Sequence, residues 1–122
     1  TEYEKNLDFQ NAPFGITGLE TELALSLMQL YHTKRLGLAE LIAKFTVAPA
    51  KLLKLAKGTL SVGADGDVTV FDPDHEWTFE RESTGSKSFN NPFYGWPLKG
   101  RAVATIVGGK KVWAESAEAV PA

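Results

Sequence analysis

The sequence predicts an α/β protein in which helices come first and strands follow. Between residues 17 and 57, Leu and Ala recur at the three- and four-residue spacing of amphipathic helices. After Gly58 the composition changes to Val, Thr, Trp, Phe and Gly, a change that favours strands. Gly108-Gly109 separates two runs of strand-forming residues and predicts a hairpin, because both positions tolerate positive φ. We therefore divide the chain into residues 1–57 and 58–122.

Three helices are expected in the first part, over about residues 17–31, 37–45 and 46–57. Thr17 and Glu20 have the spacing of a capping box, in which each side chain accepts a backbone N–H at the start of the helix. Thr46 is expected to cap the third helix and to place Pro49 in its first turn, where a missing N–H loses no intrahelical bond. Lys57-Gly58 has the residue types that end helices.

Short strands are expected in the second part, at Thr59–Val62, Val68–Phe71, Glu76–Arg81, Arg101–Val107 and Lys110–Ala114. Asp72-Pro73-Asp74 has turn chemistry and is expected to close the second of them. The stretch from Ser83 to Leu98 holds too many Gly, Pro and Asn residues for a regular element and is expected to be irregular. Residues 115–122 are expected to be a fraying tail.

Composition excludes several classes of function. The chain has 122 residues with 13 basic and 15 acidic side chains, so it lacks the positive charge that nucleic acids or anionic membranes attract. Without cysteine it has no disulfide, thiolate zinc site or cysteine nucleophile, and a cytoplasmic location is expected. Its apolar stretches are shorter than the roughly 20 residues that span a bilayer. It begins at Thr1, with no Met and no signal pattern, and we treat it as a fragment.

The usual catalytic and metal-binding patterns are missing from these residues. His32 and His75 lie on different expected elements without a partner at ligand spacing, which predicts surface or helix-end histidines. Four aspartates, at positions 65, 67, 72 and 74, lack the Gly and Glu of a calcium loop and are expected at turns and strand ends. There is no phosphate loop and no nucleophile elbow. We expect no metal ligand and no catalytic residue in this chain.

Two segments are candidates for binding. The residues from Ala12 to Gly18 form a tight glycine-bearing loop before a helix, where backbone N–H groups can bind a carboxylate or carbonyl oxygen; the alternative is a plain connection into the helix. Phe93, Tyr94 and Trp96 are expected to anchor their loop on the core, and the alternative is a binding platform.

The first of these segments carries a resemblance to a known family. The run Ala12-Pro13-Phe14-Gly15-Ile16-x-Gly18-Leu19-Glu20-Thr21-x-Leu23 resembles a signature of bacterial dihydroorotases. The segments Thr46-x-x-Pro49-Ala50-Lys51 and Lys87-Ser88 to Asn91-Pro92-Phe93-x-Gly95 agree with it. The strand segments after Gly58 resemble many amidohydrolases, including hydantoinases and allantoinases.

The resemblance implies a fold and an activity. The fold would be the C-terminal part of a (β/α)8 amidohydrolase barrel, followed by strands of a small β-sandwich domain that the other end of the polypeptide completes. The activity would be the zinc-dependent, reversible cyclisation of N-carbamoyl-L-aspartate to L-dihydroorotate in pyrimidine synthesis. The zinc ligands and the catalytic Asp would lie upstream of Thr1, so this chain alone would be inactive. Phe14 and Gly15 match positions whose backbone contacts the substrate, and Pro13 and Ile16 would shape their loop.

The resemblance leaves alternatives open. The whole protein could be an allantoinase or hydantoinase, or an inactive dihydroorotase-like partner of aspartate transcarbamoylase, and the chain could also be a free-standing binding domain. The expected partners are the remainder of the same polypeptide, a small-molecule substrate, and either further copies of the enzyme or aspartate transcarbamoylase. No nucleic acid or membrane partner is expected.

Overall fold

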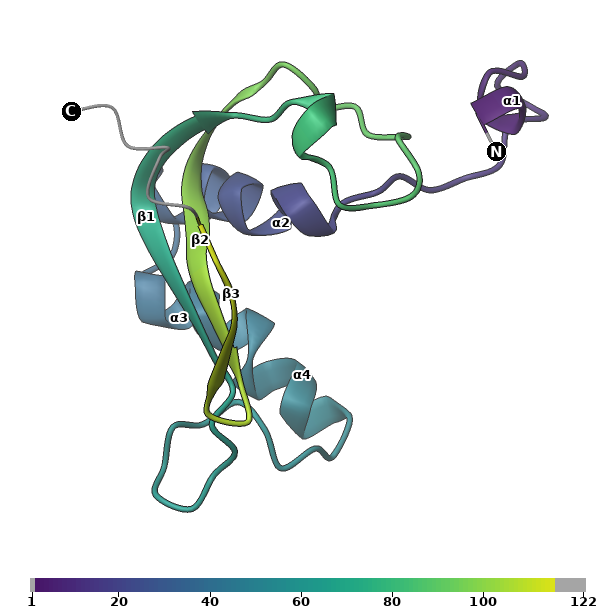
Figure 1. Cartoon of the computed structure of the whole chain (residues 1–122). Helices are drawn as coiled ribbons and strands as arrows, with labels where there is room; N and C mark the ends of the chain where they lie inside the picture. Colours follow the sequence, from purple (N-terminus) through teal and green to yellow (C-terminus); the bar gives the residue numbers. More distant parts are fainter. Residues whose placement is uncertain (1, 116–122) are drawn as a thin grey trace.

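The computed structural model describes residues 2–115, in which helices precede a small antiparallel sheet (Figure 1). The helical elements are α1 (Glu2–Lys5), α2 (Leu19–Ser26), α3 (Leu38–Phe45) and α4 (Val47–Leu52), together with the π-helical turn η1 (Leu27–Tyr31) that extends α2. The strands are β1 (Val68–Thr78), β2 (Pro97–Val107) and β3 (Lys110–Ala114), and a short 3-10 turn, η2 (Arg81–Ser83), follows β1. Helices followed by strands confirm the predicted order of the two parts.

The sheet has the strand order β1-β2-β3, and both pairs are antiparallel. The predicted hairpin is confirmed, because Val107 pairs with Lys110 and the two glycines between them have φ of 56° and 76°. Helices α2 and η1 pack against β2, while α3 packs against α4 and η1. In Figure 1, α1 lies apart from this body, at the far end of the extended segment that leads into α2.

The predicted turn at Asp72-Pro73-Asp74 is wrong, because β1 runs through it as one strand. Asp72 pairs with Arg101 and Glu76 pairs with Lys99. Between these two pairs, β1 therefore advances by four residues while β2 advances by two. Pro73 has no N–H to donate, and the N–H of Asp74 donates to Asp72 Oδ1 at 2.8 Å, which produces a local bulge. Pairing with β2 resumes beyond the bulge and ends at Thr78, so Arg81 falls in η2 and not in a strand.

Two other predicted bounds are also wrong. Residues 59–62 form no strand: no described strand pairs with them, and Thr59 Oγ1 lies 2.7 Å from Ser61 Oγ in a local turn. The third predicted helix ends at Leu52 and not at Lys57, since Lys54 has a φ of 55° that a helix does not allow. Pro49 lies in the first turn of α4, as predicted, but the hydroxyl of Thr46 donates to Ile42 O at 2.9 Å and makes no cap bond.

The core is small and joins α2 to the sheet. Ala24 of α2 packs with Phe79 and Leu98, and these three side chains are almost fully buried. Leu27 and Leu41 are buried as well. Many other large apolar side chains of the helices and of the 52–62 segment stay exposed, including Leu52 at 82 % and Val62 fully. The described helical and sheet parts therefore hold together through a limited apolar contact.

The chain end is described only as far as Glu115, whose N–H donates to Val103 O at 3.0 Å and whose carboxylate pairs with Arg101 at 2.8 Å. The rest of the predicted fraying tail lies outside the described residues. Within residues 2–115, no helix has both the length and the apolar character needed to cross a membrane.

Candidate substrate loop

The two predicted site residues lie in the extended segment before α2 and are open to solvent. The side chain of Phe14 is 97 % exposed. Gly15 has a φ of +98°, and a Cβ placed on it would meet no described atom within 4 Å. This part of the loop therefore owes its shape to its backbone and to polar contacts, since it does not pack on a core.

A lysine holds one side of this loop. Lys5 Nζ donates to the carbonyl oxygens of Pro13 at 2.6 Å, Phe14 at 3.0 Å and Gly15 at 2.7 Å. No peptide bond of the described chain is cis, and the C=O and N–H of a trans peptide point in opposite directions. The carbonyls that face Lys5 therefore direct the following N–H groups, those of residues 14–16, away from it. An outward row of N–H groups is the arrangement that the sequence predicts for this loop.

A second segment, distant in sequence, also bonds to this loop. Asn90 Nδ2 donates to Gly15 O at 2.6 Å. The carbonyl oxygen of Asn90 accepts from Thr17, at 2.9 Å from its N and 3.3 Å from its Oγ1, and Asn91 Nδ2 donates to Thr17 O at 2.7 Å. Figure 1 shows the loop that follows η2 folding back beside the segment that leads into α2.

The same loop takes the carboxylate that was expected to cap α2. Glu20 Oε1 accepts from Ser86 N at 3.0 Å and from Ser86 Oγ at 2.7 Å. The Ser86 hydroxyl bond favours the charged form and lowers the pKa of Glu20, against the smaller opposing effect of burial. The predicted capping box is wrong for this reason: Gly18 is the N-cap residue, and both Thr17 and Glu20 bond to residues 86–90 instead.

The predicted anchoring role of the aromatic residues in this loop is confirmed for Phe93 and Tyr94. The Tyr94 ring stacks on Phe79, with 4.9 Å between centroids, and both Phe93 and Tyr94 pack against the core. Trp96 contacts the edge of Phe93 and remains 48 % exposed. These contacts fix the loop of residues 83–96 on the same core that holds α2.

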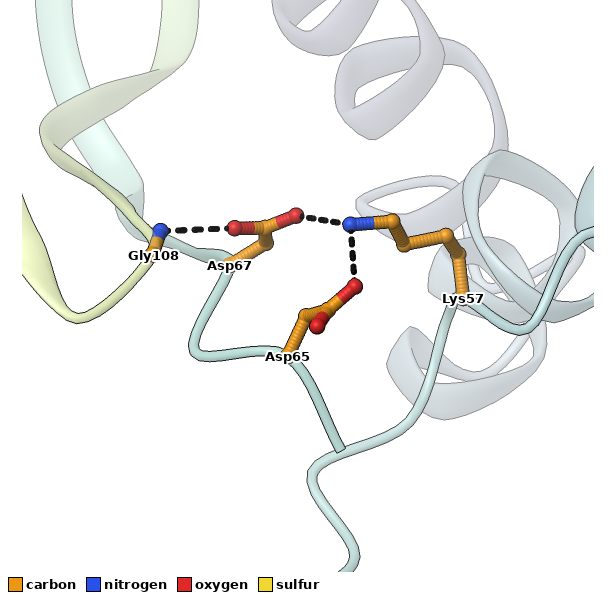
Figure 2. A network of polar contacts seen from close by, with 4 residues as sticks. All are labelled: Lys57, Asp65, Asp67 and Gly108. Carbon is orange, nitrogen blue, oxygen red and sulfur yellow. Dashed lines mark hydrogen bonds and ion pairs between the residues drawn. The ribbon is translucent and has the colours of Figure 1, made fainter. Parts of the chain in front are cut away.

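Asp65 and Asp67 lie in the irregular segment before β1, as predicted, whereas Asp72 and Asp74 lie inside β1 at its bulge, where the prediction of a turn or strand end is wrong. Figure 2 shows Lys57 between Asp65 and Asp67, with 2.6 Å to an oxygen of each, and Asp67 also accepts from Gly108 N at 2.8 Å. The bonds to Asp65 and then Asp67 raise the pKa of Lys57, and the Lys57 bond lowers that of Asp67. This network joins the 57–67 segment to the β2–β3 hairpin. Asp74 pairs with Lys99 at 3.1 Å.

The two histidines lie on different elements, as predicted. His32 ends η1, as predicted for a helix-end histidine, and its Nε2 lies 2.8 Å from Pro73 O. His75 lies half-buried on β1. Among the described residues, no three side chains of His, Asp or Glu come close enough together to hold a metal ion.

An open cleft of about 710 Å³ lies between the helices and the sheet. Phe45 of α3, Leu53 after α4 and Phe71 of β1 line its apolar wall, and Lys57 and Asp67 also contribute to its lining. The candidate loop of residues 12–18 takes no part in this cleft.

The sequence profile of the amidohydrolase family matches residues 13–112, and the chain belongs to this family. Dihydroorotases are among the curated relatives: the chain is 51 % identical over 110 residues to that of Citrifermentans bemidjiense and 46 % identical to that of Solibacter usitatus. Each alignment covers 90 % of this chain and 26 % of the relative, so the chain spans about a quarter of the length of these relatives.

The structural comparison agrees with the family. The L-hydantoinase (dihydropyrimidinase) of Arthrobacter aurescens superposes with a TM-score of 0.80 at 35 % identity, over 93 % of this chain and 26 % of that protein. A D-hydantoinase superposes with the same TM-score at 26 % identity, over 93 % of this chain and 25 % of that protein. The predicted fold class, an α/β portion of an amidohydrolase with helices followed by strands, is confirmed.

Sequence reasoning identified the candidate loop but not the residues that hold it. The segment from Lys87 to Asn91 shares the family resemblance but has no pattern that predicts a role, and Ser86 has none either. The available signal was the pair Asn90-Asn91 in a stretch rich in loop-forming residues, since amide side chains often bond to a nearby backbone.

Proposed function

We propose that this chain is part of a dihydroorotase, which reversibly cyclises N-carbamoyl-L-aspartate to L-dihydroorotate. The identity to named dihydroorotases carries the proposal, at 51 % and 52 % for two of them. The hydantoinases of similar fold are 26 % and 35 % identical. A hydantoinase is the second candidate, because two hydantoinases superpose on 93 % of this chain with a TM-score of 0.80.

In this proposal, Phe14 and Gly15 supply backbone contacts to the substrate. Gly15 lacks a side chain at a position where a Cβ would project into open space, so a ligand can approach the peptide backbone closely. The loop carbonyls are held by Lys5 and Asn90, which directs N–H groups to the opposite side. Fixed N–H donors suit the carbonyl and carboxylate oxygens of a dihydroorotate ring, because no reorganisation is needed when the ligand binds.

The zinc and the catalytic groups of this activity do not fit the residues of this chain. No three His, Asp or Glu side chains gather within residues 2–115. We propose that zinc ligands and the catalytic Asp belong to the three quarters of the relatives' length that the chain does not span. The catalytic steps are therefore assigned to that part, and the role of this chain is to hold the substrate loop and to support the fold.

The proposal is tested with the full-length protein that contains this chain. Its kcat/KM is measured on dihydroorotate, hydantoin and allantoin, with metal content determined on the same sample. We expect dihydroorotate to be the preferred substrate by at least about a hundredfold, a transition-state difference of roughly 2.7 kcal/mol. A preference for hydantoin or allantoin would instead identify another cyclic-amide hydrolase.

Turnover of none of the three substrates would favour the inactive dihydroorotase-like partner of aspartate transcarbamoylase. Size-exclusion chromatography of the full-length protein, with and without that enzyme, then separates a homo-oligomer from a mixed complex. We propose that the intact protein works in the cytoplasm, in one of these two assemblies.

A further inference from the structure

The loop that carries Phe14 and Gly15 is fixed by a segment more than 70 residues further along the chain. Asn90 Nδ2 donates to Gly15 O at 2.6 Å, and the Asn90 carbonyl accepts the N–H of Thr17 at 2.9 Å. Asn90 thus bonds to the residues before and after Ile16, which are Gly15 and Thr17. The Asn90 side chain reaches the carbonyl oxygen of Gly15 from the sheet part of the chain.

A chain of contacts connects Asn90 to the core. The neighbouring Asn91 is buried, donates to Thr17 O at 2.7 Å and accepts from Phe93 N at 2.9 Å. Phe93 in turn packs against the cluster that contains Phe79 and Leu98. The position of Asn90 is therefore set by a rigid, aromatic-anchored loop.

Holding one carbonyl also orients the next N–H. The peptide between Gly15 and Ile16 is planar and trans, so a bond that fixes the oxygen of Gly15 fixes the direction of the Ile16 N–H. Glycine by itself leaves that peptide free to rotate, because its backbone has the widest range of φ and ψ. Lys5 also bonds to this oxygen, at 2.7 Å, through a half-buried side chain of α1, which lies apart from the body.

We propose that Asn90 is a positioning residue for substrate binding: it holds the Gly15 carbonyl so that the loop presents its N–H groups to the ligand before the ligand arrives. This inference rests on the proposed role of Phe14 and Gly15. It extends that role to a residue of the sheet part, whose loop would thereby help to set the affinity for substrate.

The test uses the full-length protein with Asn90→Ala and Asn90→Asp. Alanine removes the donor, whereas aspartate keeps the volume and places a carboxylate oxygen against the Gly15 carbonyl. Ser88→Ala is the matched control, because Ser88 is an exposed polar residue of the same loop for which the structure gives no contact to residues 12–18. If the alanine variant does not fold, the aspartate variant alone carries the test.

Two readouts are combined. Hydrogen exchange of the Thr17 amide, which donates to the Asn90 carbonyl, is measured without substrate and is expected to be about tenfold faster in both Asn90 variants and unchanged in Ser88→Ala. The KM for dihydroorotate is expected to rise five- to tenfold, with kcat within twofold and metal content unchanged, because the loop is lost as a preorganised contact while the chemistry stays intact. If Asn90 had only a structural role, its variants would lower the stability of the protein without raising KM while kcat stays constant.

The outcomes separate this inference from the proposed function. Unchanged exchange in the Asn90 variants overturns the positioning role, even if the protein turns over dihydroorotate normally. Faster exchange with an unchanged KM overturns it as well. If the parent protein does not turn over dihydroorotate, the proposed function fails, and the exchange measurement still decides whether Asn90 holds the loop.

Discussion

Replacing Gly15 by valine in the full-length protein is the most direct test of the substrate loop. Gly15 has a φ of +98°, a region in which a β-branched residue is an outlier. Holding such a residue there costs about 1–3 kcal/mol. A Cβ at this position would meet no described atom within 4 Å, so steric crowding within the chain adds nothing to that cost.

The upper part of this range sets the expected loss. Valine is β-branched and tolerates a positive φ poorly. We therefore expect kcat/KM for dihydroorotate to fall about a hundredfold, or roughly 3 kcal/mol. Two causes add to this value: the loop leaves the conformation that binds substrate, and the new side chain crowds a ligand that approaches the backbone. Metal content is expected to stay at the parent value, because Gly15 has no side chain that could bind a metal and the proposed zinc ligands lie outside this chain.

Gly63→Val is the matched control, since Gly63 has a φ of +86° and equally open surroundings but lies in a turn outside the loop. It is expected to lower stability by a similar amount and to leave kcat/KM unchanged. Lys111→Ala, on the hairpin, is a surface change that is expected to shift stability by less than about 0.5 kcal/mol. Parent kcat/KM in Gly15→Val, or an equal loss in Gly63→Val, would refute the assignment of Phe14 and Gly15 to substrate binding.

Three further predictions concern stability. A Cβ at Gly100 would clash with Cδ1 of the buried Leu27, and Gly100 has a φ of +98°. Gly100→Ala is therefore expected to lower the free energy of unfolding of the full-length protein by about 2–5 kcal/mol, measured with urea. Adding Leu27→Ala should recover the steric part of this loss, and strictly additive losses in the double variant would contradict the prediction. The Lys57 bond lowers the pKa of Asp67, so the stability that this carboxylate contributes is complete above its ordinary pKa of 3.8 and is lost as the pH falls below that value. Exchange protection of the Gly108 amide should fall over that window, and it should be low and independent of pH in Asp67→Ala, which removes the acceptor. The isolated chain of residues 1–122 is expected to aggregate or to melt without a sharp transition, because large apolar side chains such as Leu52 are exposed; a monodisperse monomer with cooperative melting would favour a free-standing binding domain.

Features that depend on short-range interactions could be predicted from the sequence. The first two predicted helices begin and end near the expected residues, because the spacing of Leu and Ala acts within one or two turns. The hairpin at Gly108-Gly109 is another local feature, since two residues that tolerate positive φ suffice to set it. The candidate loop was also marked locally, by Pro13 and Gly15 before a helix. The division of the chain at Gly58 remains a prediction.

Features that depend on distant partners were decided by the tertiary structure. Asp72-Pro73-Asp74 has the residues of a turn, yet β1 continues through it because β2 offers hydrogen bonds on both sides of the bulge. Residues 59–62 have the composition of a strand, but a strand needs a neighbour, and none lies beside them in the described chain.

The start of α2 shows the same competition at the candidate site. Thr17 and Glu20 have the spacing of a capping box, but the loop of residues 86–90 provides other partners for both, and Gly18 begins the helix without a side-chain cap. The sequence by itself determined which residues form the loop around Gly15. Only the tertiary structure decided what holds that loop, because Asn90 reaches Gly15 through the folding of a segment 75 residues away.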